Sequence, residues 1–193
     1  MKPGKIIGRI LLFIFIAGVF AILGRIFMMD DNGSLTKITP TESAKEAFAS
    51  LGKEAFATHK FRASIAPDGY FSAHSMVYNR SQRELQLTAR YNESIYKYMD
   101  VADGRDFYWE LRDEEGNTIS RGTVAEEEQK YFYRHFRLVF SDVTVEEGEA
   151  LYLFLCCDAV DYPKAETIGF PVHQADQEWK AYKLDGEERA ALS

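Results

Sequence analysis

The chain has 193 residues, of which 46% are hydrophobic and 14% aromatic, and this apolar content excludes wholesale disorder. All 30 acidic residues follow residue 29, together with 19 of the 23 basic residues, so that part carries a formal net charge of −11. A surface this acidic repels phosphate backbones, which argues against nucleic acid as a partner. The length leaves room for one domain of ordinary size beyond a short N-terminal segment.

The N-terminal segment contains an uncharged apolar run, residues 10–24, which flanking apolar residues extend to 6–29. As a helix, residues 6–29 would span about 36 Å, enough to cross a hydrocarbon core of about 30 Å. We therefore predict a transmembrane helix over 6–29 that holds the protein in a cell membrane as a signal anchor. Basic residues (Lys2, Lys5, Arg9) precede the run and Asp30 and Asp31 follow it. Because positive flanks stay inside, residues 1–9 are expected in the cytoplasm and the remainder outside the cell.

A cleaved signal peptide is the alternative interpretation of the same run, with Val19, Phe20 and Ala21 as its cleavage site. Against cleavage, apolar residues continue beyond this point and Phe20 is bulky where small residues are preferred. The sequence therefore favours an anchor that stays attached.

Residues 30–60 are predicted to be a linker that contains a helix over 40–58. Thr39 can cap the helix, Pro40 suits its first position, and Glu42 completes a reciprocal capping pattern. Apolar residues then recur at three- and four-residue spacing and give the helix one apolar face. They are Ala44, Ala47, Phe48, Leu51 and Ala55.

From residue 61 onward, short alternating runs are broken by turns, a pattern typical of antiparallel strands. The run 107–111 ends in the turn-forming residues 113–117 and leads into 118–124, which predicts a hairpin. Seven or so strands without intervening helices predict a mainly β fold, an antiparallel sandwich over residues 61–184. The polar residues 185–193 are expected to be a frayed tail.

Trp109 on a predicted mid-domain strand, and the run 148–154 entering a later one, resemble the core tryptophan and tyrosine corner of immunoglobulin-like domains. The family places Asp where Gly148 stands and Cys where Phe154 stands, and no cysteine faces Trp109 from an earlier strand. The resemblance covers residues 61–184. It implies an immunoglobulin-like β-sandwich and carries no function.

No short motif in the sequence indicates catalysis, a metal site or a cofactor. The four histidines are widely separated, and phosphate-binding glycine loops, serine elbows and Cys-x-x-Cys pairs are lacking. The two cysteines, Cys156 and Cys157, are adjacent and are interpreted as unpaired thiols, which suits a bacterial cell surface. Acidic clusters at 113–115, 126–128, 146–149 and 158–161 are assigned to loops, where calcium binding is an open alternative.

Tyrosines exceed what one face of a sandwich needs. Core and cross-strand packing is the first interpretation of them, and an aromatic binding surface for protein or glycan is the second. The candidate residues are Tyr91, Tyr96, Tyr98, Tyr108, Tyr131 and Tyr133. With an anchor and one β domain, the sequence predicts an extracellular, non-catalytic binding or envelope-assembly module. Its expected partners are the membrane, through residues 6–29, and an envelope protein or cell-wall polymer. The alternative is an envelope hydrolase whose site is assembled from carboxylates distant in sequence.

Overall fold

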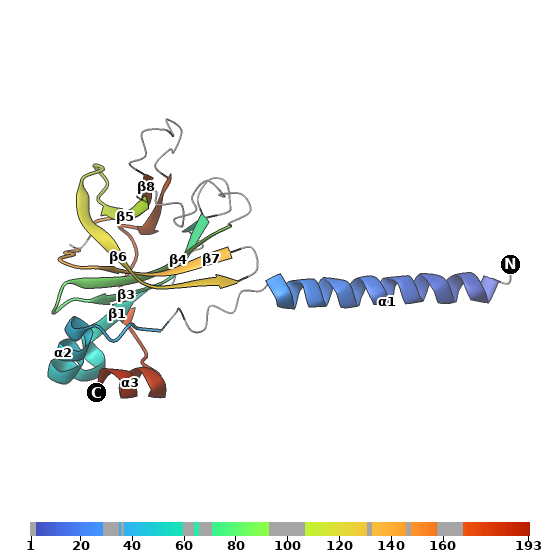
Figure 1. The fold of residues 1–193 in the computed structure, drawn as a ribbon, viewed down its shortest axis with the longest axis horizontal. Helices are drawn as coiled ribbons and strands as arrows, with labels where there is room; N and C mark the ends of the chain where they lie inside the picture. The colour runs from blue at the N-terminus through green and yellow to red at the C-terminus, as the bar shows by residue number, and fades with distance from the viewer. Residues whose placement is uncertain are drawn as a thin grey trace. The chain divides into compact units, whose positions relative to one another are not determined.

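The computed structural model describes residues 3–28, 35, 37–59, 64–65, 71–92, 107–130, 133–145, 148–157 and 168–193 (Figure 1). The chain divides into two units, Met1–Asn32 and Gly33–Ser193. Each unit is described by itself.

The first unit is a single helix, α1 (Pro3–Met28). Its side chains are apolar on every side and lie exposed; Phe13, for example, is 73% exposed. The stretch Ile6–Leu23 is long and apolar enough to cross a membrane, a property that anchors and signal sequences share. The predicted apolar N-terminal helix is therefore confirmed, while its insertion and orientation remain predictions.

In the second unit, the described residues form one antiparallel sheet of ten strands. The strands are β1 (Phe56–Thr58), β2 (Ser64–Ile65), β3 (Phe71–Asn79), β4 (Glu84–Asn92), β5 (Phe107–Arg112), β6 (Thr118–Lys130), β7 (Tyr133–Phe140), β8 (Leu151–Cys157), β9 (Ile168–His173) and β10 (Lys180–Ala181). Their order is β10-β1-β3-β4-β7-β6-β5-β8-β9, and β2 pairs with β3 beside this path. The predicted hairpin is confirmed as β5 and β6, which pair antiparallel across the turn at Asp113–Asn117.

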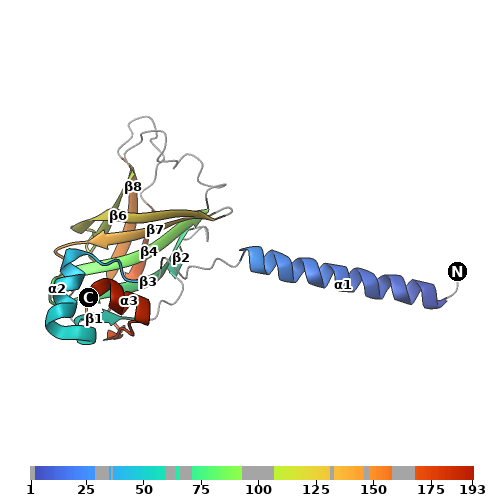
Figure 2. The same cartoon turned by 60° about the horizontal axis from the view of Figure 1, so that its bottom comes forward.

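The predicted immunoglobulin-like sandwich is not confirmed, because the described strands form one continuous curled sheet (Figures 1 and 2). The long strand β6 pairs with β5 through its first part and with β7 along most of its length, so pairing is never interrupted. A bulge between Val124 and Glu126 lets β6 bend as the sheet curls. Alternation of apolar residues is the same for a curled sheet and a sandwich, so it did not distinguish them.

The main core fills the concave side of the curl. It contains Met76, Leu87, Trp109, Leu138 and Leu153 among its buried residues, which come from five different strands. The expected core tryptophan is thus confirmed, and its ring lies 5.4 Å from that of Phe136, centroid to centroid. The expected tyrosine corner is not confirmed. The hydroxyl of Tyr152 makes no hydrogen bond with the described residues, whereas the hydroxyl of Tyr78 donates to the Val143 carbonyl at 2.9 Å.

A second apolar cluster lies on the opposite side of the sheet, under α2 (Glu42–Leu51), the 3-10 turn η1 (Gly52–Ala55) and α3 (Gly186–Leu192) (Figure 2). Its buried residues are Ile38, Ala44, Ala47, Ala55, Phe56, Val77, Leu184 and Leu192. The helix expected over 40–58 is shorter, because Gly52 ends it and residues 56–58 pair with β3 and β10. Residues 186–192, expected to fray, form α3 because Asp185 and Glu188 make a capping box.

Part of the expected linker is bound to the convex face of the sheet. We call Leu35 and residues 37–41 the docked segment. The hydroxyl of Thr88 donates to the Leu35 carbonyl at 2.6 Å, and the Gln86 amide exchanges hydrogen bonds of 2.7 and 2.9 Å with the backbone of Thr39. Thr41 donates to the Glu84 carboxylate at 2.9 Å. The docked segment therefore runs along β4 instead of hanging free.

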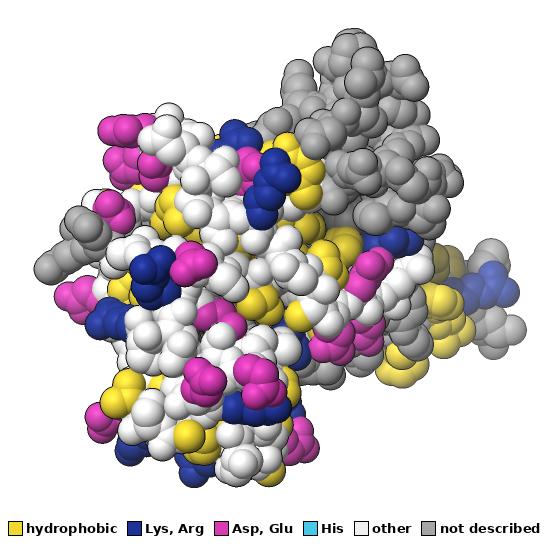
Figure 3. Space-filling view, turned by 60° about the vertical axis from the view of Figure 1, so that its left-hand side comes forward, with side chains coloured by type: hydrophobic (Ala, Val, Ile, Leu, Met, Phe, Trp, Pro, Cys, Tyr) yellow, Lys and Arg dark blue, Asp and Glu magenta, His cyan; other side chains and the backbone are white. Residues whose placement is uncertain are grey.

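Charged side chains of both signs are interspersed on the face drawn in Figure 3, and apolar side chains form only small separate areas there. On that face, the drawing offers no broad apolar patch of the kind that marks a large docking surface. Recognition on this face therefore has to come from particular polar and aromatic groups.

Candidate functional site

A cleft of about 730 Å³ opens beside the end of β9 and the turn that follows it. It is lined by Arg80, Val145, Gly148, His173, Ala175, Asp176, Gln177, Glu178 and Trp179. This volume lies within the range of about 300–1,000 Å³ that is typical of small-molecule sites. Apart from Val145 and Ala175, the side chains that line it are polar or aromatic.

Aromatic rings behind the cleft join the two ends of the curled sheet. His59 follows β1, His173 ends β9, and Trp179 precedes β10. The ring of His173 stacks on that of Trp179 at 4.8 Å, and the ring of His59 lies 4.9 Å from His173 and 5.2 Å from Trp179. Tyr78 on β3 lies 5.2 Å from Trp179. The histidines, widely separated in sequence, are thus brought together in two pairs by the fold, His59 with His173 here and His74 with His135 elsewhere, where the ring centroids lie 6.5 Å apart.

His173 is only 2% exposed and is neutral at pH 7. Burial, with a smaller contribution from the nearby His59, lowers the pKa of its imidazole to about 4, although Asp176 partly offsets the effect. Its buried Nδ1 atom has no hydrogen-bond partner among the described residues. A neutral imidazole with an unpaired nitrogen is therefore part of the cleft wall.

The rim of the cleft is formed by the turn after β9. The backbone N–H of Gln177 donates to the Gln174 carbonyl at 2.9 Å, and the Gln177 side chain accepts from the Gln174 N–H at 3.0 Å. Within the described residues, no hydrogen-bond partner is present for the indole N–H of Trp179 or for the side chains of Arg80, Asp176 and Glu178. The cleft therefore offers both donors and acceptors that no other described residue uses.

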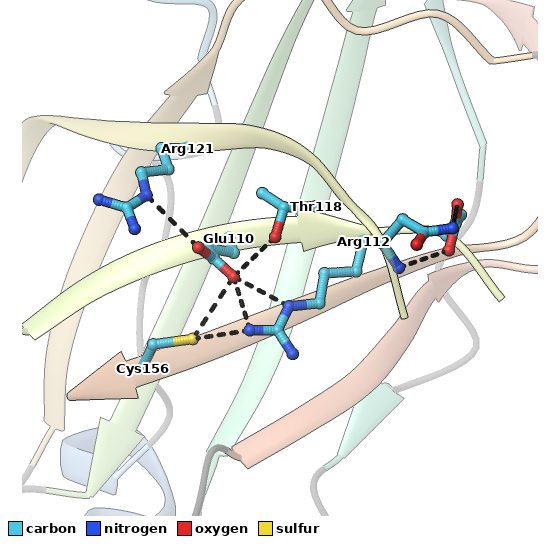
Figure 4. A network of polar contacts seen from close by, with 7 residues as sticks. Glu110, Arg112, Thr118, Arg121 and Cys156 are labelled. Carbon is cyan, nitrogen blue, oxygen red and sulfur yellow. Dashed lines mark hydrogen bonds and ion pairs between the residues drawn. The ribbon is translucent and has the colours of Figure 1, made fainter. Parts of the chain in front are cut away.

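A second arrangement of functional groups lies on the convex face, on β5, β6 and β8 (Figure 4). The carboxylate of Glu110 accepts from both Nε and one terminal nitrogen of Arg112, at 2.9 and 2.6 Å, and from the Thr118 hydroxyl at 3.1 Å. Arg121 approaches its other oxygen at 3.4 Å, and the Cys156 thiol lies 3.8 Å from Oε2. Glu110 and Arg112 are two positions apart on β5, so their side chains lie on the same face of the sheet. Arg121 is paired with Glu110 across the sheet and therefore lies on that face as well.

The two arginines also cover aromatic rings. The guanidinium of Arg112 lies 4.5 Å from the ring centroid of Phe154, and that of Arg121 lies 4.4 Å from Tyr108. We call Tyr108, Arg112, Arg121, Tyr152 and Phe154 the arginine–aromatic patch. The side chain of Arg121 is 66% exposed and that of Arg112 is 24% exposed, so both can meet a partner.

Glu110 acts as the fixed centre of this patch. Burial alone would raise the pKa of its carboxyl, but hydrogen bonds from Arg112 and Thr118 and the charges of Arg112 and Arg121 hold it below its usual value. The carboxylate is therefore ionised at neutral pH and orients two arginines. Sequence reasoning found only Tyr108 of this arrangement and missed Glu110, Arg112 and Arg121, although charged and aromatic residues alternate at 108, 110 and 112.

The predicted tyrosine surface is only partly within the described residues. Tyr96, Tyr98, Tyr131 and the side chain of Tyr91 lie outside them. Tyr108 belongs to the arginine–aromatic patch, whereas Tyr133 begins β7 under the guanidinium of Arg90, at 4.6 Å. Strand β6 lies between β5, which carries Tyr108, and β7, which carries Tyr133. Measured along β6, the two tyrosines are about 23 Å apart, at a rise of about 3.3 Å per residue. The fold therefore does not bring Tyr108 and Tyr133 together.

The acidic cluster at 126–128, assigned to a loop from sequence, lies within β6. Glu126 pairs with Arg137 at 3.1 Å and Glu127 with Arg134 at 3.0 Å, so both carboxylates have cationic partners on β7. Residues 146–147 and 158–161 lie outside the described part of the chain. Among the described residues, no group of three or more potential ligands is placed to hold a metal ion.

No protein-family model matches the chain, and searches of curated proteins and of solved structures gave no match either. Functional inference therefore rests on the groups described above.

Proposed function

We propose that this chain is a single-pass membrane protein whose β domain lies outside the cell and acts by binding, as a non-catalytic envelope-assembly module of a bacterial surface. The apolar helix α1 supports the anchor, and the basic residues before it support a cytoplasmic N-terminus. The signal-peptide interpretation remains the alternative for α1.

The observation that carries the proposal is the docked segment. Six residues, 29–34, connect α1 to Leu35 in the sequence. Leu35 is held on the β domain by Thr88 and by Arg137, whose Nε donates to its carbonyl at 3.3 Å. A domain joined to its anchor by so short a connection suits a partner that is itself at or near the membrane.

The arginine–aromatic patch is the proposed contact for an envelope protein. Arg and Tyr are enriched at the centres of protein interfaces, since each combines a broad apolar surface with polar groups. Arg121 has only a long contact to Glu110 and keeps donors for an acidic group on the partner. Glu110 fixes the arginines beforehand, which lowers the entropy lost on binding.

The hydrolase alternative needs a carboxylic acid kept protonated at neutral pH. The three buried glutamates among the described residues each accept a hydrogen bond from another side chain of the protein. Glu84 accepts from Thr41, Glu110 accepts from Arg112, and Glu188 accepts from Tyr182. Because each of these buried carboxylates accepts hydrogen bonds from other residues of the fold, a structural use is favoured, and binding is the better-supported proposal.

The proposal is tested by cross-linking on intact cells that carry the tagged full-length protein, followed by mass spectrometry. One dominant envelope partner is expected for the wild type, with capture reduced at least about fivefold by Arg121→Glu. Lys53→Glu, the same charge change at an exposed position on η1, is the matched control and should leave capture unchanged. Equal capture by both variants would remove the patch from the proposal, and an absence of any partner would contradict it.

Topology has its own test. The intact mass of the purified protein shows whether residues 1–21 remain attached, and protease added outside intact cells should digest the β domain. A mass without residues 1–21 would replace the anchor with a signal peptide cleaved after Ala21.

A further inference from the structure

We propose that the cleft beside Trp179 is a carbohydrate-binding site that takes a neutral sugar unit of a cell-envelope glycan. This inference rests on the proposed function, because it identifies the chemistry of one ligand that an envelope-binding domain would recognise. It uses a surface separate from the arginine–aromatic patch, so the two can be tested independently.

The aromatic part of the site is Trp179, which is half-buried and fixed from behind. His173 stacks against the indole, and Tyr78 and His59 lie at its other sides, so the ring has little freedom to move. A pyranose ring presents C–H groups on its apolar faces, and these are attracted to the negative face of an aromatic ring. A fixed indole at a cleft is thus suited to hold a sugar without a large loss of entropy.

The polar part of the site supplies donors and acceptors in similar measure. Arg80 and the indole N–H of Trp179 donate, whereas Asp176 and Glu178 accept, and none has a hydrogen-bond partner among the described residues. Each sugar hydroxyl both donates and accepts, so a polyhydroxylated ligand can use all four groups. The wall also contains Nδ1 of His173, a buried polar atom without a partner in the described part of the chain.

The same groups disfavour other ligand classes. An anion would meet the carboxylates of Asp176 and Glu178, and a small cation would meet the guanidinium of Arg80. A peptide that docks through apolar anchors needs apolar pockets, but only Val145 and Ala175 contribute aliphatic side chains here. A neutral ligand with many hydroxyls fits this lining best.

The test is isothermal titration calorimetry of the full-length protein in detergent micelles. The probes are maltohexaose, cellohexaose, chitohexaose and muramidase fragments of purified bacterial cell wall, with an acidic and a basic decapeptide for comparison. Saturable binding of at least one saccharide is expected, with neither peptide competing. Losing a hydrogen bond from a charged group weakens binding roughly tenfold, so Arg80→Ala and Glu178→Gln should each raise Kd by about that factor.

Two further variants keep the outcome interpretable. Trp179→Phe replaces the indole by a smaller aromatic ring without the N–H, and should raise Kd about fivefold without loss of cooperative unfolding. Glu114→Gln, in the exposed turn between β5 and β6, should leave Kd within about twofold of the wild type. Unchanged affinity in the cleft variants, or binding of a peptide in place of every saccharide, would overturn the inference.

Failure here is distinguishable from failure of the proposed function. If folded wild-type protein gives no heat with any saccharide but cross-linking still captures an envelope protein, the sugar site is wrong and the binding module stands. If saccharides bind and cross-linking captures no protein, the proposed sugar site stands and the proposed protein partner is contradicted.

Discussion

The backbone N–H of Ile38 donates a hydrogen bond of 3.0 Å to the side chain of Glu188, although 150 positions separate the two residues. The same carboxylate accepts from the Tyr182 hydroxyl at 2.6 Å and from the Asp185 N–H at 2.7 Å. One buried side chain near the C-terminus therefore holds the docked segment, the start of α3 and the strand-end residue Tyr182 together. Burial and the bond to Glu188 also raise the pKa of Tyr182.

Replacing Glu188 by alanine should lower the free energy of unfolding by about 3 kcal/mol, because one buried and two partly buried hydrogen-bond donors would lose their acceptor. Urea unfolding of the full-length protein in detergent, followed by tryptophan fluorescence, measures the change. The neighbouring variant Glu187→Ala is the control. The Glu187 side chain is 82% exposed and contacts Lys37 at the surface, so its loss should cost less than about 1 kcal/mol. Similar losses in both variants would contradict the role given to Glu188.

Local structure was readable from the sequence wherever one element could be recognised by its own pattern. The apolar run predicted α1, and alternation predicted most of β3 to β9. β1 was missed because Phe56 and Ala57 directly follow a helical pattern and were interpreted as part of the same helix. α3 is shorter than most helices, so the capping pair Asp185 and Glu188 was overlooked.

The candidate sites depend on contacts between distant residues, which local patterns do not report. The closure of the curled sheet brings His59 to within 4.9 Å of His173, ring centroid to ring centroid, and nothing near either residue indicates it. The partner of Glu110 on β6 likewise follows from the register of the hairpin. A turn of different length would have placed another residue opposite it.

Glu110 should make stability depend on pH in the acidic range. Its folded-state pKa lies below the ordinary value of 4.5, so its carboxylate stabilises the fold at pH values above 4.5. That contribution is lost as the pH falls through the folded-state pKa. Glu110→Gln should therefore cost about 2 kcal/mol at pH 7 and should flatten the fall in stability below pH 4.5. Urea midpoints from pH 7 to pH 3 measure this; a Glu114→Gln control should keep the wild-type slope.

His173 should act in a different pH window. Its folded-state pKa is about 4 and its ordinary value is 6.5, so the unfolded chain binds more protons between these values. Stability is therefore fully present above pH 6.5 and falls as the pH drops towards 4, by about 2–3 kcal/mol in total. His173→Phe keeps an aromatic ring and should remove this loss. His74→Gln is the control, and thermal midpoints between pH 7.5 and 4.5 that fall equally in both variants would contradict the assignment.

Gly169 on β9 should tolerate no side chain, because the ring of Phe154 lies over it from the neighbouring strand β8. A Cβ atom built at Gly169 would come within 2.1 Å of that ring. Gly169→Ala should therefore lower the free energy of unfolding by about 2–3 kcal/mol. Gly186→Ala is the matched control; nothing lies within 4 Å of its added Cβ, so the change should be close to neutral.

The cause of the Gly169 effect can be isolated by a double-mutant cycle with Phe154→Ala. Removing the ring relieves the overlap, so the double variant should be more stable than the sum of the single changes predicts, by at least about 1 kcal/mol. Because Arg112 stacks on the same ring at 4.5 Å, Phe154→Ala should also weaken partner capture through the arginine–aromatic patch. Strict additivity in the cycle would mean that backbone conformation at Gly169, and not the overlap with Phe154, sets the cost.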